Sequence, residues 1–164
     1  MNDYILEADF KHAMRRLAST ITVVTCAVDG RRFGMTATAV TSVCADPPSL
    51  LVCVNRSSSL HTPLEKTGRF CVNLLKVGQE SVSAAFGGQK KGEERFSEGS
   101  WLEDDIGVPY LASAQANVFC ITATKLQFGT HTIFVGQVQN VISENEVSPL
   151  IFQDGGFAKA LSLS

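Results

Sequence analysis

Residues 33–64 read FGMTATAVTSVCADPPSLLVCVNRSSSLHTPL, and this stretch decides how the rest of the chain is interpreted. Its first part, GMTATAVTS at 34–42, has the β-branched residues of a strand combined with small and hydroxyl side chains. Small side chains let a flat ring lie close to the backbone, and hydroxyls add hydrogen-bond donors. A strand packed against something bulky has the same composition, so both interpretations stay open. The candidate binding residues are Thr36, Ala37, Thr38, Ala39, Val40, Thr41 and Ser42.

The second part, NRSSSLHT at 55–62, combines an asparagine, three serines and a histidine immediately before a predicted short helix that ends near Gly68. Hydroxyls and free backbone N–H groups at a helix start favour an anion, and the helix dipole adds to the attraction. Plain capping of the helix by serine is the alternative. The candidate anion-binding residues are Asn55, Ser57, Ser58, His61 and Thr62.

Elements outside this stretch indicate a mainly β (α+β) fold. Apolar residues at helical spacing predict a helix over 10–18 that Asp9 caps and that packs on the rest of the chain. A second helix is expected at 79–86, ended by two glycines, and a long polar surface loop at 89–105. About six strands with short helices between them, and no alternating βα units, favour an antiparallel barrel of Greek-key type. The strands are expected at 21–28, 32–41, 49–55, 70–75, 117–128, 131–143 and 150–153.

Bulk properties narrow the function classes. A length of 164 residues fits one domain, 1–164, and a net charge of −2 without a basic stripe argues against nucleic acid. Five cysteines without a CxxC pair predict reduced thiols packed as small hydrophobes, and no metal site. The absence of an apolar leader or of a spanning segment leads us to expect a cytoplasmic protein that does not enter a membrane.

Known catalytic motifs are missing from the sequence. There is no GxGxxG, no P-loop and no GxSxG elbow, and no residues near His131 complete a nucleophilic triad. These absences leave the small-residue strand and the serine segment as the main candidate sites.

Taken in order, several segments resemble the short-chain NAD(P)H:flavin oxidoreductases, the flavin-reductase-like FMN-binding split barrels. These segments are LASTITVVT, the 33–64 stretch, FCVNLL, AAFGG with a following ERF, and GTHTIFVGQV, and they span most of the chain from residue 17 to residue 138. The terminal GGFAKAL also resembles the family's closing segment, with Phe157 where Tyr is common.

The resemblance implies a homodimer that holds FMN or FAD at the subunit interface and reduces it with NADH or NADPH. Many relatives supply reduced flavin to a separate monooxygenase, such as that of the 4-hydroxyphenylacetate 3-monooxygenase type. Two alternatives stay open: reduction of a cobalt corrinoid acceptor, and a non-enzymatic FMN electron-transfer module.

The resemblance also assigns roles by position. The strand 36–42 would line the isoalloxazine ring, and the residues of 55–62 would hold the ribityl-phosphate end. His131 would lie where the nicotinamide docks, as the catalytic residue. The residues that would flank the flavin or its phosphate are Phe86, Gly87, Gly88, Arg95 and Phe96, with Phe157 nearby.

Overall fold

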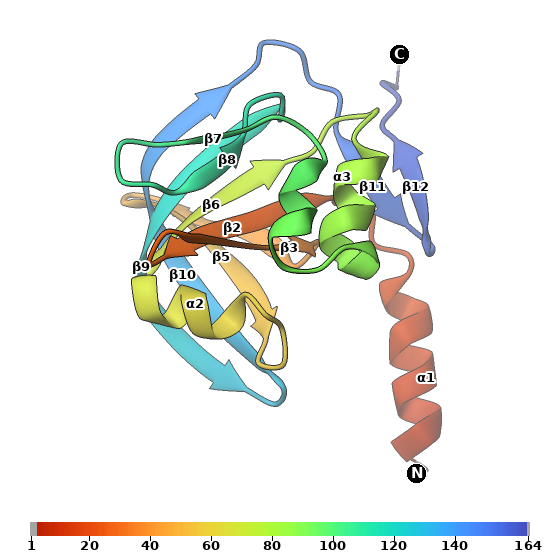
Figure 1. Cartoon of the computed structure of the whole chain (residues 1–164). Helices are drawn as coiled ribbons and strands as arrows, with labels where there is room; N and C mark the ends of the chain where they lie inside the picture. The colour runs from red at the N-terminus through yellow and green to blue at the C-terminus, as the bar shows by residue number, and fades with distance from the viewer. Residues whose placement is uncertain (1–2, 164) are drawn as a thin grey trace.

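The computed structural model describes residues 3–163, and its centre is a curved antiparallel sheet of seven strands. The strand order is β3-β2-β6-β9-β10-β5-β4, which confirms the expected mainly β architecture (Figure 1). The strands are β2 (Thr22–Val28), β3 (Arg31–Ala37), β4 (Val40–Ala45), β5 (Pro48–Asn55), β6 (Arg69–Leu74), β9 (Ala116–Phe128) and β10 (His131–Ser143).

The two edges of the sheet are joined by the chain itself, because β3 leads directly into β4. The sequence predicted one strand over 32–41, but the structure bends it at Thr38 and Ala39 into two strands. The Ala39 carbonyl accepts a hydrogen bond from Cys53 N at 3.0 Å, so the bend is held against β5. This connection turns the curved sheet into a split barrel.

Local sequence signals explain the hairpins and the curvature. Asp29 and Gly30 have φ values of 51° and 73°, the left-handed conformation that a two-residue turn between β2 and β3 requires. Gly136 lies at an irregularity in the β9–β10 pairing. A side chain there would lie 2.5 Å from Phe70 Cζ, so the close approach of the strand to the barrel interior requires glycine.

The barrel interior is filled by apolar side chains from every strand of the sheet and from α2 (His61–Thr67), which covers one end. Leu60 and Leu64 bring the α2 segment into this core with no exposed surface. The helix ends at Gly68, whose φ of 64° and N–H bond to the Leu64 carbonyl form a left-handed cap. The sequence prediction for this helix is confirmed.

A second apolar core lies between the barrel and the segment 80–111. This segment contains α3 (Glu80–Ala84), a π-helical turn η1 (Ala85–Gln89), a 3-10 helix η2 (Gly92–Ser97) and a hairpin made of β7 (Trp101–Glu103) and β8 (Pro109–Leu111). The expected segment at 89–105 does run over the surface, since Phe96 is its only buried residue, but it is not a plain loop because it contains η2 and β7. The rings of Phe96 and Trp101 each pack on Phe86 with a centroid distance of 5.0 Å.

The N-terminal helix differs from its prediction. The helix α1 spans Asp3–Met14, so it begins and ends earlier than 10–18, and Asp9 lies inside it rather than at its cap. It extends away from the barrel (Figure 1), and Phe10, Met14 and Leu17 are all exposed. The apolar spacing correctly indicated a helix, but the packing on this chain is not observed.

A second, small sheet of three strands joins the C-terminal segment to a strand near the start of the barrel. It contains β1 (Ser19–Thr20), β11 (Leu150–Gln153) and β12 (Gly156–Lys159), and the sequence predicted only the second of these. Within residues 3–163, no helix is long and apolar enough to cross a membrane.

The thiols mostly behave as predicted. Cys26, Cys71 and Cys120 are buried, and burial raises the pKa of Cys26 and of Cys120 to about 12. Cys44 is exposed, which the prediction of packed thiols did not anticipate.

Candidate functional site

A cavity of about 460 Å³ lies at the end of β3. It is lined by Thr36, Ala37 and Thr38 on one side and by α3 and the π-helical turn on the other. Phe157, half exposed on β12, stands at its border. The structure thus brings the small-residue strand, the glycine pair and the C-terminal aromatic residue together, although they are far apart in the sequence.

The wall opposite β3 is held by one hydrogen bond and kept open by glycine. Thr36 Oγ1 donates to the Ser83 carbonyl at 2.7 Å, which fixes α3 beside the strand. A side chain at Gly87 would find Thr36 Oγ1 at 4.0 Å as its nearest neighbour, and one at Gly88 would meet nothing within 4 Å. Gly88 has a φ of 120°, which favours glycine, so the turn presents bare backbone beside the cavity.

The other half of the small-residue stretch faces elsewhere. Val40, Thr41 and Ser42 line a separate cavity of about 400 Å³ with residues of β1 and the barrel. Thr38, at the bend, lines both. The seven candidate residues therefore do not share one cavity, because the bend divides them.

The serine turn is organised by Asn55. Its Oδ1 accepts hydrogen bonds from Ser57 N and Ser57 Oγ, each at 2.9 Å. The neighbouring Ser58 Oγ is buried and finds no hydrogen-bond partner within the described residues. A buried polar atom without a partner is rare and costs free energy unless a ligand or water satisfies it. Thr62 follows in the first turn of α2 and is exposed.

Arg95 joins the serine turn to β3. Its Nη1 donates to the Gly34 carbonyl at 2.7 Å and to Ser59 Oγ at 2.9 Å, and its Nε donates to the Lys90 carbonyl at 3.1 Å. Three chain segments thus meet at one guanidinium group, which places a positive charge between the serine turn and the strand that leads to the cavity.

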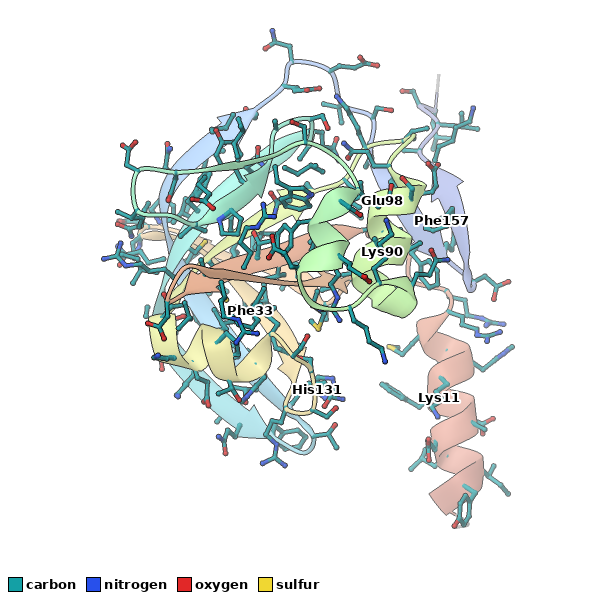
Figure 2. The ribbon with its side chains drawn as sticks, in the orientation of Figure 1. Lys11, Phe33, Lys90, Glu98, His131 and Phe157 are labelled. Atoms are coloured by element: carbon teal, nitrogen blue, oxygen red, sulfur yellow. The ribbon has the colours of Figure 1, made fainter. Side chains whose placement is uncertain are left out.

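The two candidate histidines have different positions. His131 is exposed at the start of β10, opposite Asn55 in the strand pairing, with its Nδ1 2.9 Å from Thr130 Oγ1 (Figure 2). His61 is buried, and its Nε2 lies 2.8 Å from Thr132 Oγ1. The structure therefore brings His131 beside the serine turn and turns the His61 ring toward the barrel.

Two of the three predicted aromatic residues lie in the core rather than in the cavity. Phe86 and Phe96 are buried and pack edge to face, 5.0 Å between centroids. Their backbone neighbours Gly87 and Arg95 are the groups that reach the site. Sequence reasoning missed Ser83, since a backbone carbonyl leaves no motif. Ser59 belongs to the candidate segment 55–62 but was not among the candidate anion-binding residues.

Charged pairs surround the segment that carries Arg95. Lys90 donates to Glu98 at 2.6 Å, and this bond lowers the pKa of the Glu98 carboxyl (Figure 2). Arg32 pairs with Glu93, and its guanidinium lies 4.3 Å from the centroid of the Phe96 ring. These contacts hold the η2 segment in place. Among residues 3–163 there is no cluster of three metal-ligating side chains.

The residues present fit a flavin nucleotide. The lining of the cavity beside β3 combines polar groups with the apolar side chains of Ile21, Phe152 and Phe157, as sites for flat heterocycles do. The serine turn offers hydroxyls, a guanidinium group and the unpartnered Ser58 Oγ for a phosphate.

Comparisons with known proteins agree with this chemistry. Residues 14–161 match the family described as "Flavin reductase like domain". The chain is 43% identical over 154 residues to the reductase component of FADH(2)-dependent resorcinol hydroxylase from Rhizobium, covering 93% of this chain and 86% of that protein. It is 38% identical over 143 residues to the FMN reductase (NADH) RutF of Pseudomonas syringae, covering 87% and 80%.

Solved structures show the same fold. The flavin reductase PheA2 superposes with a TM-score of 0.86 at 28% identity, covering 99% of this chain and 100% of that one. The Streptomyces globisporus NADH:FAD oxidoreductase SgcE6 gives 0.88 at 28% identity, covering 95% and 94%. A second structure of SgcE6 is a complex with NAD and FAD fragments. With a family match over almost the whole chain and these relatives, the protein belongs to the flavin-reductase-like family of split barrels.

Proposed function

We propose that this chain is an NAD(P)H-dependent flavin reductase that supplies reduced flavin to a separate monooxygenase. Family membership supports the reaction class. The observation that carries the proposal is the Arg95 guanidinium group, which ties the serine turn to β3 and so connects the phosphate-binding and ring-binding segments.

In this proposal each segment binds a different part of the nucleotide. Thr36, Ala37 and Thr38 hold the edge of the isoalloxazine ring, and Gly87 and Gly88 leave space beside it. The serine turn and Arg95 hold the phosphate end. The placement of Val40 to Ser42 in another cavity, and of the His61 ring inside the barrel, leaves those residues a supporting role.

When bound, the flavin accepts a hydride at N5 from C4 of the reduced nicotinamide. The residues of this chain position the two ligands and exclude water, and correct placement is the main source of rate in such a reaction. His131 is exposed beside the serine turn, where its imidazole can hydrogen-bond a docking nicotinamide nucleotide. The protein needs no acid–base pair for this step.

We also propose a homodimer. The outer parts of β4, β9 and β10 expose large apolar side chains, which a second copy would cover. These are Val43, Ile121, Leu126, Phe128, Val141 and Ile142. Sedimentation of the purified protein tests this directly, since a monomer at micromolar concentration would contradict it.

For the electron acceptor, the relative that reduces flavin for resorcinol hydroxylase leads us to propose a partner that hydroxylates a phenol. FMN and FAD are both candidate flavins, and NADH is the favoured reductant, because it appears in the names of relatives.

The test is oxidation of NADH, followed at 340 nm, with FMN, FAD, a cobalt corrinoid or no acceptor. We expect turnover that depends on added flavin and is coupled to hydroxylation when a phenol monooxygenase is present. Turnover with the corrinoid alone would instead assign the corrinoid alternative. Flavin binding without NADH oxidation would identify an electron-transfer module and refute the proposed reductase.

A further inference from the structure

We propose that Arg56 is a positioning residue for the docking of the reduced nicotinamide. Its guanidinium group holds the turn between β9 and β10, and with it His131, at a fixed place beside the serine turn. This inference rests on the proposed function, because it takes the flavin phosphate to lie at the serine turn and the nicotinamide nucleotide to dock at His131.

The end of the β9–β10 hairpin has little support of its own. Residues 123–131 are all exposed, and both strands extend past α2 (Figure 1). The pairing of β10 with β5 ends where His131 meets Asn55. A hairpin end with few buried contacts opens easily, so the position of its turn depends on the bonds that other segments form with it.

Arg56 supplies two such bonds just beyond the last pair of β5 and β10. Its N–H donates to the Thr130 carbonyl at 2.9 Å, and its Nη2 donates to the Gly129 carbonyl at 2.9 Å. Any residue except proline can form the first bond, whereas the second requires a long side chain with a hydrogen-bond donor at its end. The arginine side chain therefore adds a tie to the turn that the backbone alone does not provide.

A second, buried bond holds the strand on the other side of His131. His61 Nε2 lies 2.8 Å from Thr132 Oγ1, and both side chains are buried. The segment from Arg56 to His61 therefore contacts the chain both before and after His131. Because the Arg56 side chain is exposed, it can be replaced without leaving a buried polar group unpaired in the core, which makes it the side that a substitution can test.

Thr130 carries the effect of Arg56 to the imidazole ring of His131. Its Oγ1 lies 2.9 Å from His131 Nδ1, so this nitrogen is occupied and Nε2 is left for a ligand. Hydride transfer requires the reacting atoms of the two cofactors to lie roughly 3–3.5 Å apart. A fixed distance between His131 and the serine turn therefore helps the nicotinamide dock in register with the flavin.

The competing role for Arg56 is direct binding of the flavin phosphate, because its side chain is exposed in the same segment as the serines. The bond to the Gly129 carbonyl argues against this role, since it directs Nη2 toward the hairpin. Arg95, by contrast, donates to Ser59 Oγ of the serine turn. The two roles predict different outcomes when Arg56 is replaced. Loss of a phosphate ligand raises the Kd of FMN, whereas loss of a positioning residue raises the KM for NADH.

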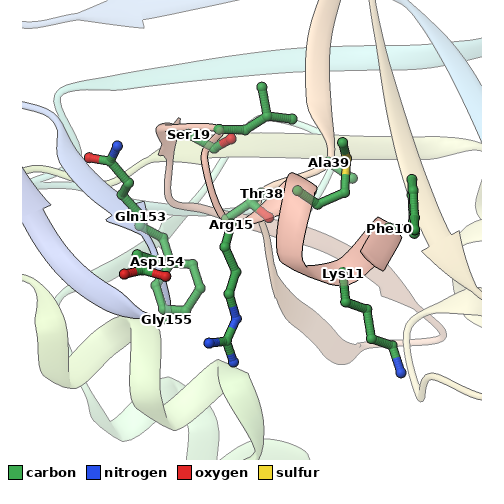
Figure 3. A pocket seen from close by; sticks show the side chains of 12 residues that line it. Phe10, Lys11, Arg15, Ser19, Thr38, Ala39, Gln153, Asp154 and Gly155 are labelled. Atoms are coloured by element: carbon green, nitrogen blue, oxygen red, sulfur yellow. The ribbon is translucent and has the colours of Figure 1, made fainter. Parts of the chain in front are cut away.

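The α1 end of the site is separate from this connection. There a cavity of about 590 Å³ lies between α1 and the β11–β12 hairpin, and Figure 3 shows Phe10 and Arg15 on one side of it and Asp154 on the other. Thr38 lines both this cavity and the one beside β3. The lining of the α1 cavity contains neither the serine turn nor the β9–β10 turn, so a change at Arg56 leaves this end of the site intact.

The test compares the KM for NADH, kcat and the Kd of FMN between the unmodified protein and Arg56→Ala. We expect the KM for NADH to rise about threefold, and kcat and the Kd of FMN each to change less than about twofold. Arg56→Lys should restore the KM, because an ammonium group can donate to the same carbonyl. Arg69→Ala, exposed at the start of β6 and outside both turns, is the matched control for the loss of an arginine charge.

A double-mutant cycle shows whether Arg56 acts through His131. In the His131→Ala background, Arg56→Ala should raise the KM no further. The inference is overturned by an equal rise in that background, by an unchanged KM in Arg56→Ala alone, or by a larger effect on the Kd of FMN than on the KM.

Unmodified protein that does not oxidise NADH at all would instead contradict the proposed function. Hydrogen exchange of the amides at 129–132 then tests the tie by itself. Faster exchange in Arg56→Ala than in Arg69→Ala supports it, and equal exchange overturns it.

Discussion

At the α2 end of the site, which is the serine turn, the side chains form hydrogen bonds with one another. At the α1 end, the side chains of Phe10 and Arg15 face solvent without such bonds to the described residues. Arg95 donates to Gly34 and Ser59, and Asn55 accepts from Ser57, all within 2.7 to 2.9 Å. At the other end Phe10 lies on α1, which extends away from the barrel (Figure 1), and Arg15 follows the helix in a turn whose carbonyl accepts a hydrogen bond from Asp154 N of the hairpin.

This difference separates two contributions to nucleotide recognition. An end whose side chains are already hydrogen-bonded to one another keeps its shape without the ligand, so binding there loses little conformational entropy. An exposed end must order its side chains when the ligand arrives, which reduces the net gain in affinity. The α2 end should therefore set the affinity for any flavin, and changes at the α1 end should affect it less.

The largest effect is expected from Gly34→Ala, at the carbonyl that Arg95 binds. The new Cβ would lie 2.5 Å from Phe86 Cε1 and 3.2 Å from Thr25 Cγ2, so the aromatic core must shift. Overpacking of this kind typically costs about 1–3 kcal/mol. Urea denaturation should show this loss in the free energy of unfolding, together with weaker FMN binding.

The matched substitution for Gly34→Ala is Gly87→Ala, on the cavity wall opposite β3. Its Cβ has no neighbour closer than 4.0 Å, so the free energy of unfolding should change by less than about 0.5 kcal/mol. FMN binding should still weaken, because the methyl group occupies space that the proposed ring needs. Normal FMN affinity in Gly87→Ala would contradict the placement of the flavin in this cavity.

The next effect is expected from Arg95→Met. The guanidinium group supplies two hydrogen bonds from a charged donor that join the serine turn to β3. Each such bond contributes about 1.5–3 kcal/mol, so we expect the Kd of FMN to rise at least tenfold. Arg95→Lys should restore only part of the affinity, because an ammonium group cannot reproduce the fork of donors. Lys91→Met, on the same loop, serves as the control for charge.

A smaller effect is expected from His131→Ala. The imidazole is exposed and its recorded partner is the adjacent Thr130 hydroxyl, so folding should not depend on it. We expect the KM for NADH to rise several-fold with little change in the Kd of FMN, measured by stopped-flow bleaching of the flavin. Unchanged bleaching traces would remove His131 from the nicotinamide site.

The sequence predicted elements whose signals are local. The turns at Asp29-Gly30 and Gly129-Thr130 were located correctly, because two-residue hairpins demand particular residues at particular positions. The strands β1, β7, β8 and β12 were missed, since they contain only two to four residues and show no periodicity. The bend at Thr38 and Ala39 was missed because the residues around it are all suited to a strand.

The site was predicted as segments but not as contacts. The serine turn and β3 were both identified from composition, yet the bond between Arg95 and Ser59 spans 36 positions and leaves no pattern in the sequence. Phe86 and Phe96 were assigned to the flavin because the family motif contains them. Their burial shows that these motif residues pack in the core, while their neighbours Gly87 and Arg95 face the cavity and the serine turn. For α1, periodicity indicated an apolar face but not what covers it.

The smallest effect is expected from the ion pair that joins α2 to β9, and it is measured as a pH dependence of the free energy of unfolding. Lys125 donates to Glu65 Oε1 at 2.7 Å, and this bond holds the pKa of the Glu65 carboxyl below its usual range. A carboxyl with a lowered pKa in the folded state stabilises the protein above its unfolded pKa of about 4.3, and the effect is lost as the pH falls through the folded value. Both side chains are partly exposed, so the gain is about 1 kcal/mol or less. Lys125→Met should therefore lower the free energy of unfolding at pH 7, and the difference should shrink as the pH falls toward 3. Lys66→Met, which breaks the more exposed pair with Asp29, should change it less. A difference between Lys125→Met and the unmodified protein that persists at pH 3 would show that the lysine stem, rather than its charge, stabilises α2 against β9.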